Sequence, residues 1–259
     1  MIYVGLDDTD TLDDPGTNQL ARHIVQRLAG QYRGRIILRH QLLEDPRVPC
    51  TKKNGCASIL LEPVGCVEGQ RRAAMVDETH LRDGVSRETR HTLHPMIEQL
   101  RQIILPWCPR GSDPGLCVTE TVPPVVVEWG LRCQRELVEQ KEARQIAAEI
   151  GIHLEGLGGT EDGVIGALAA VGLMATKNDG RVIHFGSGGE DWYDVTGCLE
   201  VGEILARGVD EIRKIDDNEL LTEGTVDVGK RLRPNYRQGK VVLFVTRNDA
   251  PHWEAVRVV

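Results

Sequence analysis

A chain of 259 residues can bury a sizeable core, so its length excludes a small scaffold that depends on disulfides. Its seven cysteines are odd in number and never spaced C-x-x-C, and the start lacks a basic, apolar leader, which together predict reduced thiols and a cytoplasmic location. A net charge of -8 argues against duplex nucleic acid as the main partner, and no apolar run reaches the roughly 18 residues that a membrane span needs.

The first half of the chain alternates between predicted strands and helices. Residues 2–6 are predicted to form a buried strand, and Gly16 with Thr17 opens an amphipathic helix whose apolar face carries Leu20, Ile24 and Leu28. Further strands are expected over 35–42, 57–62 and 116–121, and helical periodicity covers 87–105. Residues 125–133 fit a helix or a strand, and the spacing of their charged side chains favours the helix. This half is predicted to be a mixed α/β unit.

The second half predicts a separate unit. A helix over 139–150, closed by Gly151, places a domain boundary near residue 136. Strands over 152–155 and 181–186, helices over 164–174 and 198–207, and glycine-rich loops over 156–163 and 186–189 suggest a ferredoxin-like α/β sandwich. From residue 222 onward, short strands over 226–232 and 240–246 flank a predicted turn at 235–239. The fold class is therefore predicted to be α/β (α+β) with a β-rich C-terminal part.

Three carboxylates follow the first predicted strand directly, at Asp7, Asp8 and Asp10. A pair of carboxylates ~4 Å apart repels by about 1 kcal/mol in water and by several near a protein surface. A divalent cation removes this penalty, Mg²⁺ prefers one or two carboxylates with phosphate oxygens, and the free amides of the helix beginning at Gly16 and Thr17 accept a phosphate. These residues predict a magnesium and nucleotide site, and a solvated acidic turn that caps the helix is the alternative.

Two further segments offer groups for phosphate or substrate. Lys52, Lys53, Asn54 and Gly55 form a donor-rich turn before the strand at 57–62, although an ordinary surface loop has the same composition. The loops at 156–163 and 186–189 both lack the third glycine of G-x-G-x-x-G. In the first loop, Thr160 or Asp162 can cap the next helix and leave amides facing an anion or carbonyl, while close helix packing through Gly163 and Gly166 explains the glycines equally well.

Five motifs follow one another along the chain: GLDDTD at 5–10, Gly16-Thr17, P-x-x-P-C-T-K-K-N-G-C-A at 46–57, S-D-P-G-L at 112–116 and G-V-I-G-A-L-A-A-V-G at 163–172. In this order they resemble the archaeal agmatidine synthetases, which modify an isoleucine tRNA. The resemblance implies an ATP-dependent kinase-like domain over 1–136, a ferredoxin-like domain over 137–221 that helps to bind agmatine, and a β-rich extension over 222–259. In that family a cytidine base oxygen is phosphorylated, and agmatine then displaces the phosphate.

The resemblance also implies roles for individual residues. Asp7, Asp8 and Asp10 match the acids that bind the metal and ATP, and Thr17 matches a threonine that the family enzyme phosphorylates. The residues implied to contact ATP are Gly16, Thr17, Lys52, Lys53, Asn54 and Gly55, although the order within the lysine segment differs from the family's K-T-x-G-N-G. The residues expected to meet the acceptor are Asp113, Gly158, Gly159, Thr160 and Asp162.

Family members continue into an OB-fold and a cysteine zinc ribbon that grip the tRNA, and neither is recognisable here. With the acidic net charge, this favours a small-molecule acceptor and an amine as second substrate, and nucleic acid is not expected as a partner without a further protein. We therefore expect an Mg²⁺- and ATP-dependent phosphotransferase or ligase. A nucleotide or metabolite sensor without turnover and a tRNA-modifying enzyme with a separate RNA-binding partner are the alternatives, and the oligomeric state stays open, with a homodimer among the options.

Overall fold

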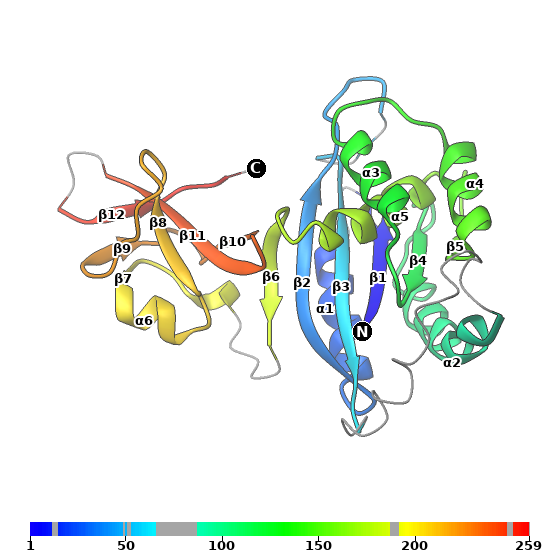
Figure 1. Ribbon diagram of the computed structural model, residues 1–259, viewed down its shortest axis with the longest axis horizontal. Coiled ribbons are helices and arrows are strands. Elements are labelled where there is room, and N and C mark those ends of the chain that lie inside the picture. The colour runs from blue at the N-terminus through cyan, green and yellow to red at the C-terminus, as the bar shows by residue number, and fades with distance from the viewer. Residues whose placement is uncertain are drawn as a thin grey trace, which may run out of the picture.

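The computed structural model describes residues 1–11, 15–48, 50, 53–65, 87–186, 192–247 and 251–258. These residues form two lobes that lie side by side (Figure 1). The first lobe comprises β1 to β6 with α1 to α5, and the second lobe comprises residues 192–258. Both lobes contain helices and strands, so the predicted mixed α/β class is confirmed. None of the helices in the described ranges combines the length and apolar character needed to cross a bilayer.

An antiparallel sheet forms the centre of the first lobe. Its strands follow the order β5-β4-β1-β3-β2-β6 and span, in chain order, β1 (Ile2–Asp7), β2 (Tyr32–Gln41), β3 (Gly55–Pro63), β4 (Gly115–Thr119), β5 (His153–Gly156) and β6 (Arg181–Phe185). Leu6 pairs with Ala57, Asp7 pairs with Gly115, and Gly115 also pairs with Gly156. This register aligns the end of β1, the starts of β3 and β4 and the end of β5 along one side of the sheet, where these strands begin or end. We call this side the acidic edge.

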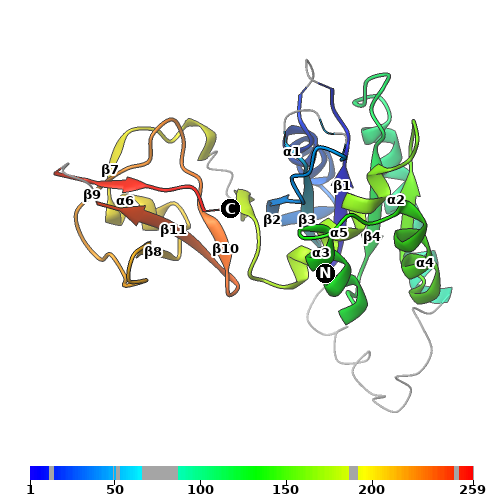
Figure 2. The ribbon, with the colours of Figure 1, turned by 90° about the horizontal axis from the view of Figure 1, so that it is seen from above.

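Helices cover both faces of this sheet (Figures 1 and 2). α1 (Thr17–Leu28) and α2 (Arg87–Ile104) lie on one face, and α3 (Pro124–Cys133), α4 (Gln140–Ile150) and α5 (Gly163–Ala175) lie on the other. Successive side chains of a strand point to opposite faces, so Ile2, Val4 and Leu6 pack into the α1 and α2 core while Tyr3 packs against the other helices. The helices expected over 125–133 and 139–150 are both confirmed, and Gly151 closes the second at φ 75°.

α5 lies unusually close to its neighbours because small residues occupy its contact faces. A Cβ on Gly5 of β1 would come within 1.9 Å of the Ala167 carbonyl oxygen, and one on Gly172 within 2.0 Å of the Val126 carbonyl oxygen in α3. At Gly163 and Gly166 an added Cβ would likewise meet the Asp113 carbonyl oxygen at 2.1 Å and the Asp7 carboxylate at 1.8 Å. The packing explanation for these two glycines is therefore confirmed, and it places the start of α5 at the acidic edge.

The second lobe is a small, strongly interrupted β structure. Its elements are η2 (Trp192–Asp194), β7 (Cys198–Glu200), α6 (Val201–Ala206), β8 (Glu211–Lys214), β9 (Thr225–Asp227), β10 (Asn235–Arg237), β11 (Lys240–Thr246) and β12 (Trp253–Ala255). The strand order is β10-β11-β12-β9-β7, with β8 parallel to β11. The pair Asn235 and Arg181 joins β10 to β6, so the hydrogen-bonded path continues from one lobe to the other.

Three expectations for the second lobe were wrong in detail. The helix expected over 198–207 is shorter, because residues 198–200 pair with β9 and a capping box between Glu200 and Glu203 starts α6 only at Val201. The strand expected over 226–232 ends at Asp227, whose carboxylate accepts a hydrogen bond from the Gly229 amide at 2.8 Å and turns the chain.

The third expectation that was wrong in detail is the turn at 235–239. Residues 235–237 form β10, and only Gln238 and Gly239 connect it to β11. Both residues have positive φ, 52° and 77°, as the type I′ turn of a two-residue hairpin loop requires, and such turns match the twist of the flanking strands. The turn residues were therefore recognised, but their polar neighbours belong to a strand.

The division into 1–136, 137–221 and 222–259 stays a prediction. Elements from both sides of residue 136 share one sheet, since β5 pairs with β4 and β6 pairs with β2. α3 and α5, one from each side, also pack together through Gly130 and Gly172. The sheet thus shows no break at residue 136.

Candidate functional site

The acidic loop that follows β1 is held to the first turn of α1. Asp7 is the last residue of β1, and Asp8 has φ 49°, in the left-handed region that turns the chain out of the sheet. Thr9 is fully buried, and its hydroxyl donates a hydrogen bond to Thr17 Oγ1 at 3.0 Å. This bond fixes the acids next to the helix start.

Asp10 lies beside the first residue of this helix. A Cβ on Gly16 would be 3.3 Å from Asp10 Oδ2, so the carboxylate reaches the N-cap position of α1. Gly16, at the N-cap position, has no side chain of its own to cap α1, and the first turn of the helix carries no acid. The amides of a helix start and their positive dipole end attract anions, so Asp10 and a phosphate would both be stabilised here.

The residues expected to meet the acceptor converge on the same edge. Asp113 precedes β4 and accepts two hydrogen bonds from Thr160, one from its amide at 2.9 Å and one from its hydroxyl at 2.5 Å. Gly159 has φ 60°, and a Cβ there would clash with Asp113 Oδ1 at 1.3 Å, so only glycine fits between them. Asp162 accepts a bond from Gln140 at 3.1 Å. Their role in substrate binding stays a prediction.

Burial and neighbouring carboxylates raise the pKa values of Asp7 and Asp8. Burial of Asp7, and then the charge of Asp8, raises the pKa of Asp7 to about 7. Burial also raises the pKa of Asp8 to about 6, followed by the charges of Asp113, Asp10 and Asp162. Carboxylates that are far apart in the sequence therefore repel one another in space, and a bound cation would lower this repulsion.

The donor set fits a hard divalent cation that is shared with a phosphate. Carboxylate oxygens are the ligands that Mg²⁺ prefers, and it uses one or two of them together with waters and substrate oxygens. Within the described part of the chain, no three of these carboxylates bring oxygens within 4.8 Å of one another, so they do not form a closed cage. The assignment of Asp7, Asp8 and Asp10 to a metal stays a prediction.

The lysine segment lies at the acidic edge, and Lys53, the one of its two lysines that the structure describes, is exposed to solvent. Lys52 is outside the described residues. Lys53 is exposed and pairs with Glu44, with Nζ and Oε1 3.4 Å apart. Asn54 donates from its side chain to the Leu43 carbonyl at 2.8 Å, and Gly55 begins β3 opposite Gln41. Asn54 thus holds the loop in place, and the predicted ATP contacts of this segment are untested.

Arg39 was not predicted to belong to the site, because in the sequence it is one residue in the middle of the predicted strand 35–42. A Cβ on Gly55 would be 2.8 Å from Arg39 Nη2, so the guanidinium covers the start of β3. The charge of Arg39 lowers the pKa of Asp7, against the larger effects of burial and Asp8. Arg39 therefore supplies positive charge to the acidic edge, and its signal in the sequence was only its position on a neighbouring strand.

A buried polar network around His40 was also missed. Its Nε2 lies 2.7 Å from Ser58 Oγ and its Nδ1 lies 2.5 Å from Asp179 Oδ1, and Gln134 donates to Asp179 Oδ2 at 3.0 Å. The connectivity is that of a Ser-His-Asp triad, but Ser58 and His40 are both 0% exposed, so no substrate reaches the hydroxyl. The network instead ties together β2, β3, the end of α3 and the loop before β6.

A cavity of about 550 Å³ lies away from these residues. It opens between α2, α4 and the strands β4 and β5, and its polar lining includes Thr119, Arg144 and His153. Thr119 pairs with Tyr3 near the start of β1, while the acids follow the end of that strand. The cavity is therefore at the other end of β4, and none of the predicted site residues lines it.

Among solved structures, this chain is similar to several of TiaS. They include apo TiaS, described as tRNAIle2 agmatidine synthetase (20% identity, TM-score 0.48), the TiaS-tRNA(Ile2)-ATP complex (21%, 0.47) and the TiaS-tRNA(Ile2)-AMPCPP-agmatine complex (20%, 0.47). Each match covers 66% of this chain and 35%, 36% and 35% of the respective solved chain. This chain thus spans about a third of the length of the structures that it matches. No curated protein matches it.

The expectation about nucleic acid was wrong. Two of these structures hold tRNA(Ile2), so nucleic acid is a partner of proteins of this kind. The argument from net charge failed because a total of -8 averages over the whole surface, whereas a polynucleotide contacts only part of it.

The sequence itself matches a family model over most of the first lobe. The model describes the TiaS TCKD domain and matches residues 3–159, which include all the acids of the acidic edge except Asp162. This match covers more than half of the chain. The resemblance to agmatidine synthetases is confirmed, and the protein belongs to the TiaS family through its TCKD domain.

Proposed function

We propose that this protein is an ATP-dependent enzyme of the agmatidine synthetase type, which modifies a base of a tRNA. ATP would transfer its γ-phosphoryl group to a carbonyl oxygen of the base, which breaks the bond between the γ-phosphorus and the bridging oxygen and releases ADP. The primary amine of agmatine would then attack the activated carbon and release phosphate. The observation that carries this proposal is the gathering of Asp7, Asp8, Asp10, Asp113 and Asp162 at one edge beside the start of α1.

The acidic edge suits phosphoryl transfer, which depends mainly on positioning and on neutralising charge. Asp7 and Asp8 would hold Mg²⁺, because burial and then the charges of neighbouring acids raise their pKa values, and a bound cation would favour their ionised forms. The first amides of α1, next to Gly16, would receive phosphate oxygens. Mg²⁺ would supply charge neutralisation at the transferred group.

Thr17 would lie at the phosphate, in line with the role that the resemblance implies for it. Thr17 is buried and its hydroxyl receives the Thr9 hydrogen bond, so the hydroxyl oxygen has a fixed position at the helix start. A hydroxyl that is already oriented loses little conformational freedom when a ligand binds. Thr17 thus has the placement of a phosphate-contacting group.

The loop before α5 would hold the acceptor. Asp113 fixes Thr160 through two hydrogen bonds and leaves no room for a side chain at Gly159. The loop therefore has one shape, and its residues face the edge at which Asp8 interacts with Asp113 and Asp162. These acids would also attract the positive charges of agmatine.

The test is ATP consumption by the purified protein with Mg²⁺, agmatine and an isoleucine tRNA transcript. We expect turnover that requires all three, with the tRNA gaining the mass of agmatine less water. Asp8→Asn should lower the rate by about 100-fold or more, because loss of one preorganised charge at a transferred group has effects of this size. Thr17→Val, which keeps the shape and removes the hydroxyl, should also lower it.

Asp216→Asn is the matched control, since Asp216 is an exposed acid in the second lobe. It should retain the wild-type rate. Wild-type turnover in Asp8→Asn would contradict the proposed site. ATP binding without turnover under every combination of substrates would favour a sensor instead.

A further inference from the structure

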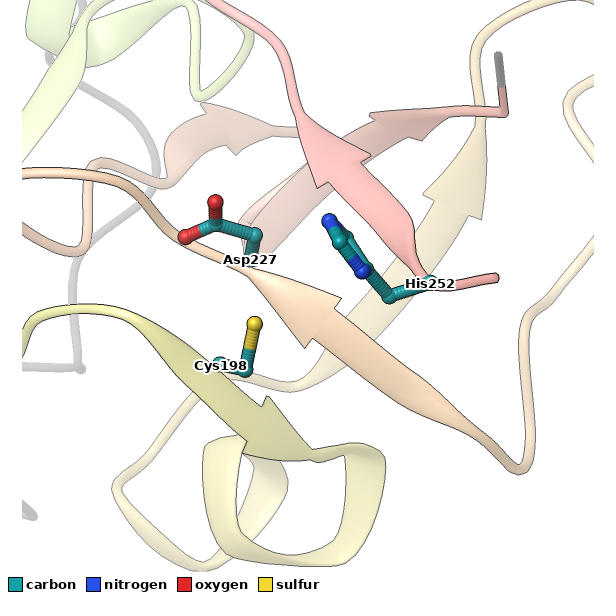
Figure 3. Close-up of side chains that lie close together, drawn as sticks. All are labelled: Cys198, Asp227 and His252. Carbon is teal, nitrogen blue, oxygen red and sulfur yellow. The ribbon is translucent and has the colours of Figure 1, made fainter. Parts of the chain in front are cut away.

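Three strands of the second lobe place Cys198, Asp227 and His252 together (Figure 3). In the register of the sheet, Cys198 pairs with Asp227 and Leu199 pairs with Val226, and Val226 pairs in turn with Trp253. Leu199, Val226 and Trp253 all pack in the core of the lobe. Because side chains alternate along a strand, their neighbours Cys198, Asp227 and His252 share the opposite face.

The donor atoms of these three residues converge on one point. The thiol sulfur, a carboxylate oxygen and an imidazole nitrogen all lie within 4.8 Å of one another. Cys198 is exposed and the other two are half-buried, so a small solute can reach the cluster. In the parts of the chain that the structure describes, this is the only group of three such donors at this spacing.

The backbone around the cluster is already fixed. Asp227 accepts the Gly229 amide on Oδ1 at 2.8 Å, which orients the carboxylate. Gly197, next to Cys198, donates to the Gly229 carbonyl and accepts from the Val228 amide, both at 2.9 Å. Hydrogen bonds of this kind, one shell away from a ligand, orient metal-binding groups in known sites.

The geometry differs from that of a catalytic cysteine triad. In such a triad the imidazole stands between the thiol and the acid, and two hydrogen bonds of about 3 Å on its two nitrogens keep sulfur and oxygen much further apart than one bond length. Here the sulfur and the carboxylate oxygen are themselves within 4.8 Å. Three donors that all approach one another surround a point, as ligands around an ion do.

We propose that Cys198, Asp227 and His252 form a binding site for a zinc-class divalent cation, independent of the magnesium site proposed at the acidic edge. A thiolate, an imidazole and a carboxylate are all ligands of Zn²⁺, whereas Mg²⁺ takes oxygen ligands. Three protein ligands at an exposed position leave the fourth position of a tetrahedral ion open to water. The ion would also link β7, β9 and the start of β12, which meet only through short ladders.

The test uses the full chain without a histidine tag, freed of metal with a chelator and titrated with Co²⁺ and then Zn²⁺. Cobalt bound by a thiolate shows a sulfur-to-metal charge-transfer absorption. We expect about one Co²⁺ per chain with this absorption, which Zn²⁺ then displaces. Cys198→Ser should abolish the absorption, and His252→Gln should weaken zinc binding by at least about 10-fold, the lower end of the loss seen for outer-shell partners alone.

Cys50→Ser is the matched control, because Cys50 is also an exposed free thiol. It should leave the absorption and the stoichiometry unchanged. Cobalt that binds without the charge-transfer absorption, or an absorption that survives in Cys198→Ser, would overturn the proposal. Equal loss in Cys50→Ser and Cys198→Ser would do so too, since it would show unspecific binding to thiols. Circular dichroism of each variant establishes that it is folded.

Discussion

At the scale of single residues, Asp7 shows how much stability is lost when several acids are held close together. Its carboxylate contacts Gly166 of α5, and burial and Asp8 raise its pKa from 3.8 to about 7. Between these pH values the folded chain binds more protons at Asp7 than the unfolded chain does, so stability falls as the pH rises through this interval. Ionised Asp7 thus weakens the fold at the pH at which a cation would need it.

This predicts that Asp7→Asn reduces the pH dependence of stability. In urea unfolding without divalent ions, the wild type should lose stability between pH 5 and pH 8, and Asp7→Asn should lose about 1–3 kcal/mol less. Added Mg²⁺ should stabilise the wild type at pH 8 and have little effect on the variant. Asp216→Asn should behave like the wild type, and equal slopes for all three proteins would refute the role of Asp7.

At the scale of elements, α5 decides where the acids meet. Its glycines let it approach β1, β4 and α3 at backbone distance, as the contacts of Gly5, Gly163 and Gly172 show. Interiors packed this tightly tolerate no added volume, because the neighbouring atoms here are backbone and cannot rotate away. The start of α5 is thereby held against Asp7 and Asp113.

Gly172→Ala tests this packing. Its Cβ would meet the Val126 carbonyl oxygen at 2.0 Å, so we expect a loss of about 2–3 kcal/mol in the free energy of unfolding, although alanine favours a helix. Gly202→Ala in α6 is the matched control, since nothing lies within 4 Å of a Cβ there. It should be neutral or stabilising. A Gly172→Ala protein as stable as the wild type would mean that α5 and α3 sit further apart.

At the scale of the whole molecule, the network of His40, Ser58, Asp179 and Gln134 joins parts of the first lobe that are far apart in sequence. Asp179 also lies next to β6, the strand through which the hydrogen-bonded path passes to the second lobe. Burial alone would raise the pKa of Asp179, but its hydrogen bonds with His40 and Gln134 and the charge of Arg237 hold it below 3.8. Ionised Asp179 therefore stabilises the fold, and this contribution is lost only as the pH falls below 3.8 toward the folded-state pKa.

Asp179→Asn should therefore be strongly destabilising. We expect a loss of about 2–4 kcal/mol at pH 7, because the variant leaves His40 without its charged partner. Gln134→Ala, which removes one hydrogen bond to the same carboxylate and one to the Gln41 carbonyl, should cost about 1–2 kcal/mol. The difference between wild type and Asp179→Asn should shrink toward pH 3. Chemical unfolding at both pH values measures it, and equal losses for the two variants would contradict this account.

Local patterns were enough to predict several parts of this protein. The runs that form β1, α1, α3 and α4 carry their own periodicity, and Gly151 marks a helix end by its left-handed conformation. The acids after β1 were also visible, because Asp7, Asp8 and Asp10 are neighbours in the chain. Prediction failed in the second lobe, where strands of three residues are too short to show a period and are defined by their partners.

The sequence by itself determined the mixed α/β class, the acidic loop beside a helix start and the family. Only the tertiary structure decided which distant residues join that loop. The charges of Asp113 and Asp162 act on Asp8, the charge of Arg39 acts on Asp7, and the donor atoms of Cys198, Asp227 and His252 lie together. Strand register and the close approach of α5 bring these residues near one another. The physical reason is that repulsion, burial and ligand geometry act over a few ångströms in space, whereas these residues are separated by tens to more than a hundred positions along the chain.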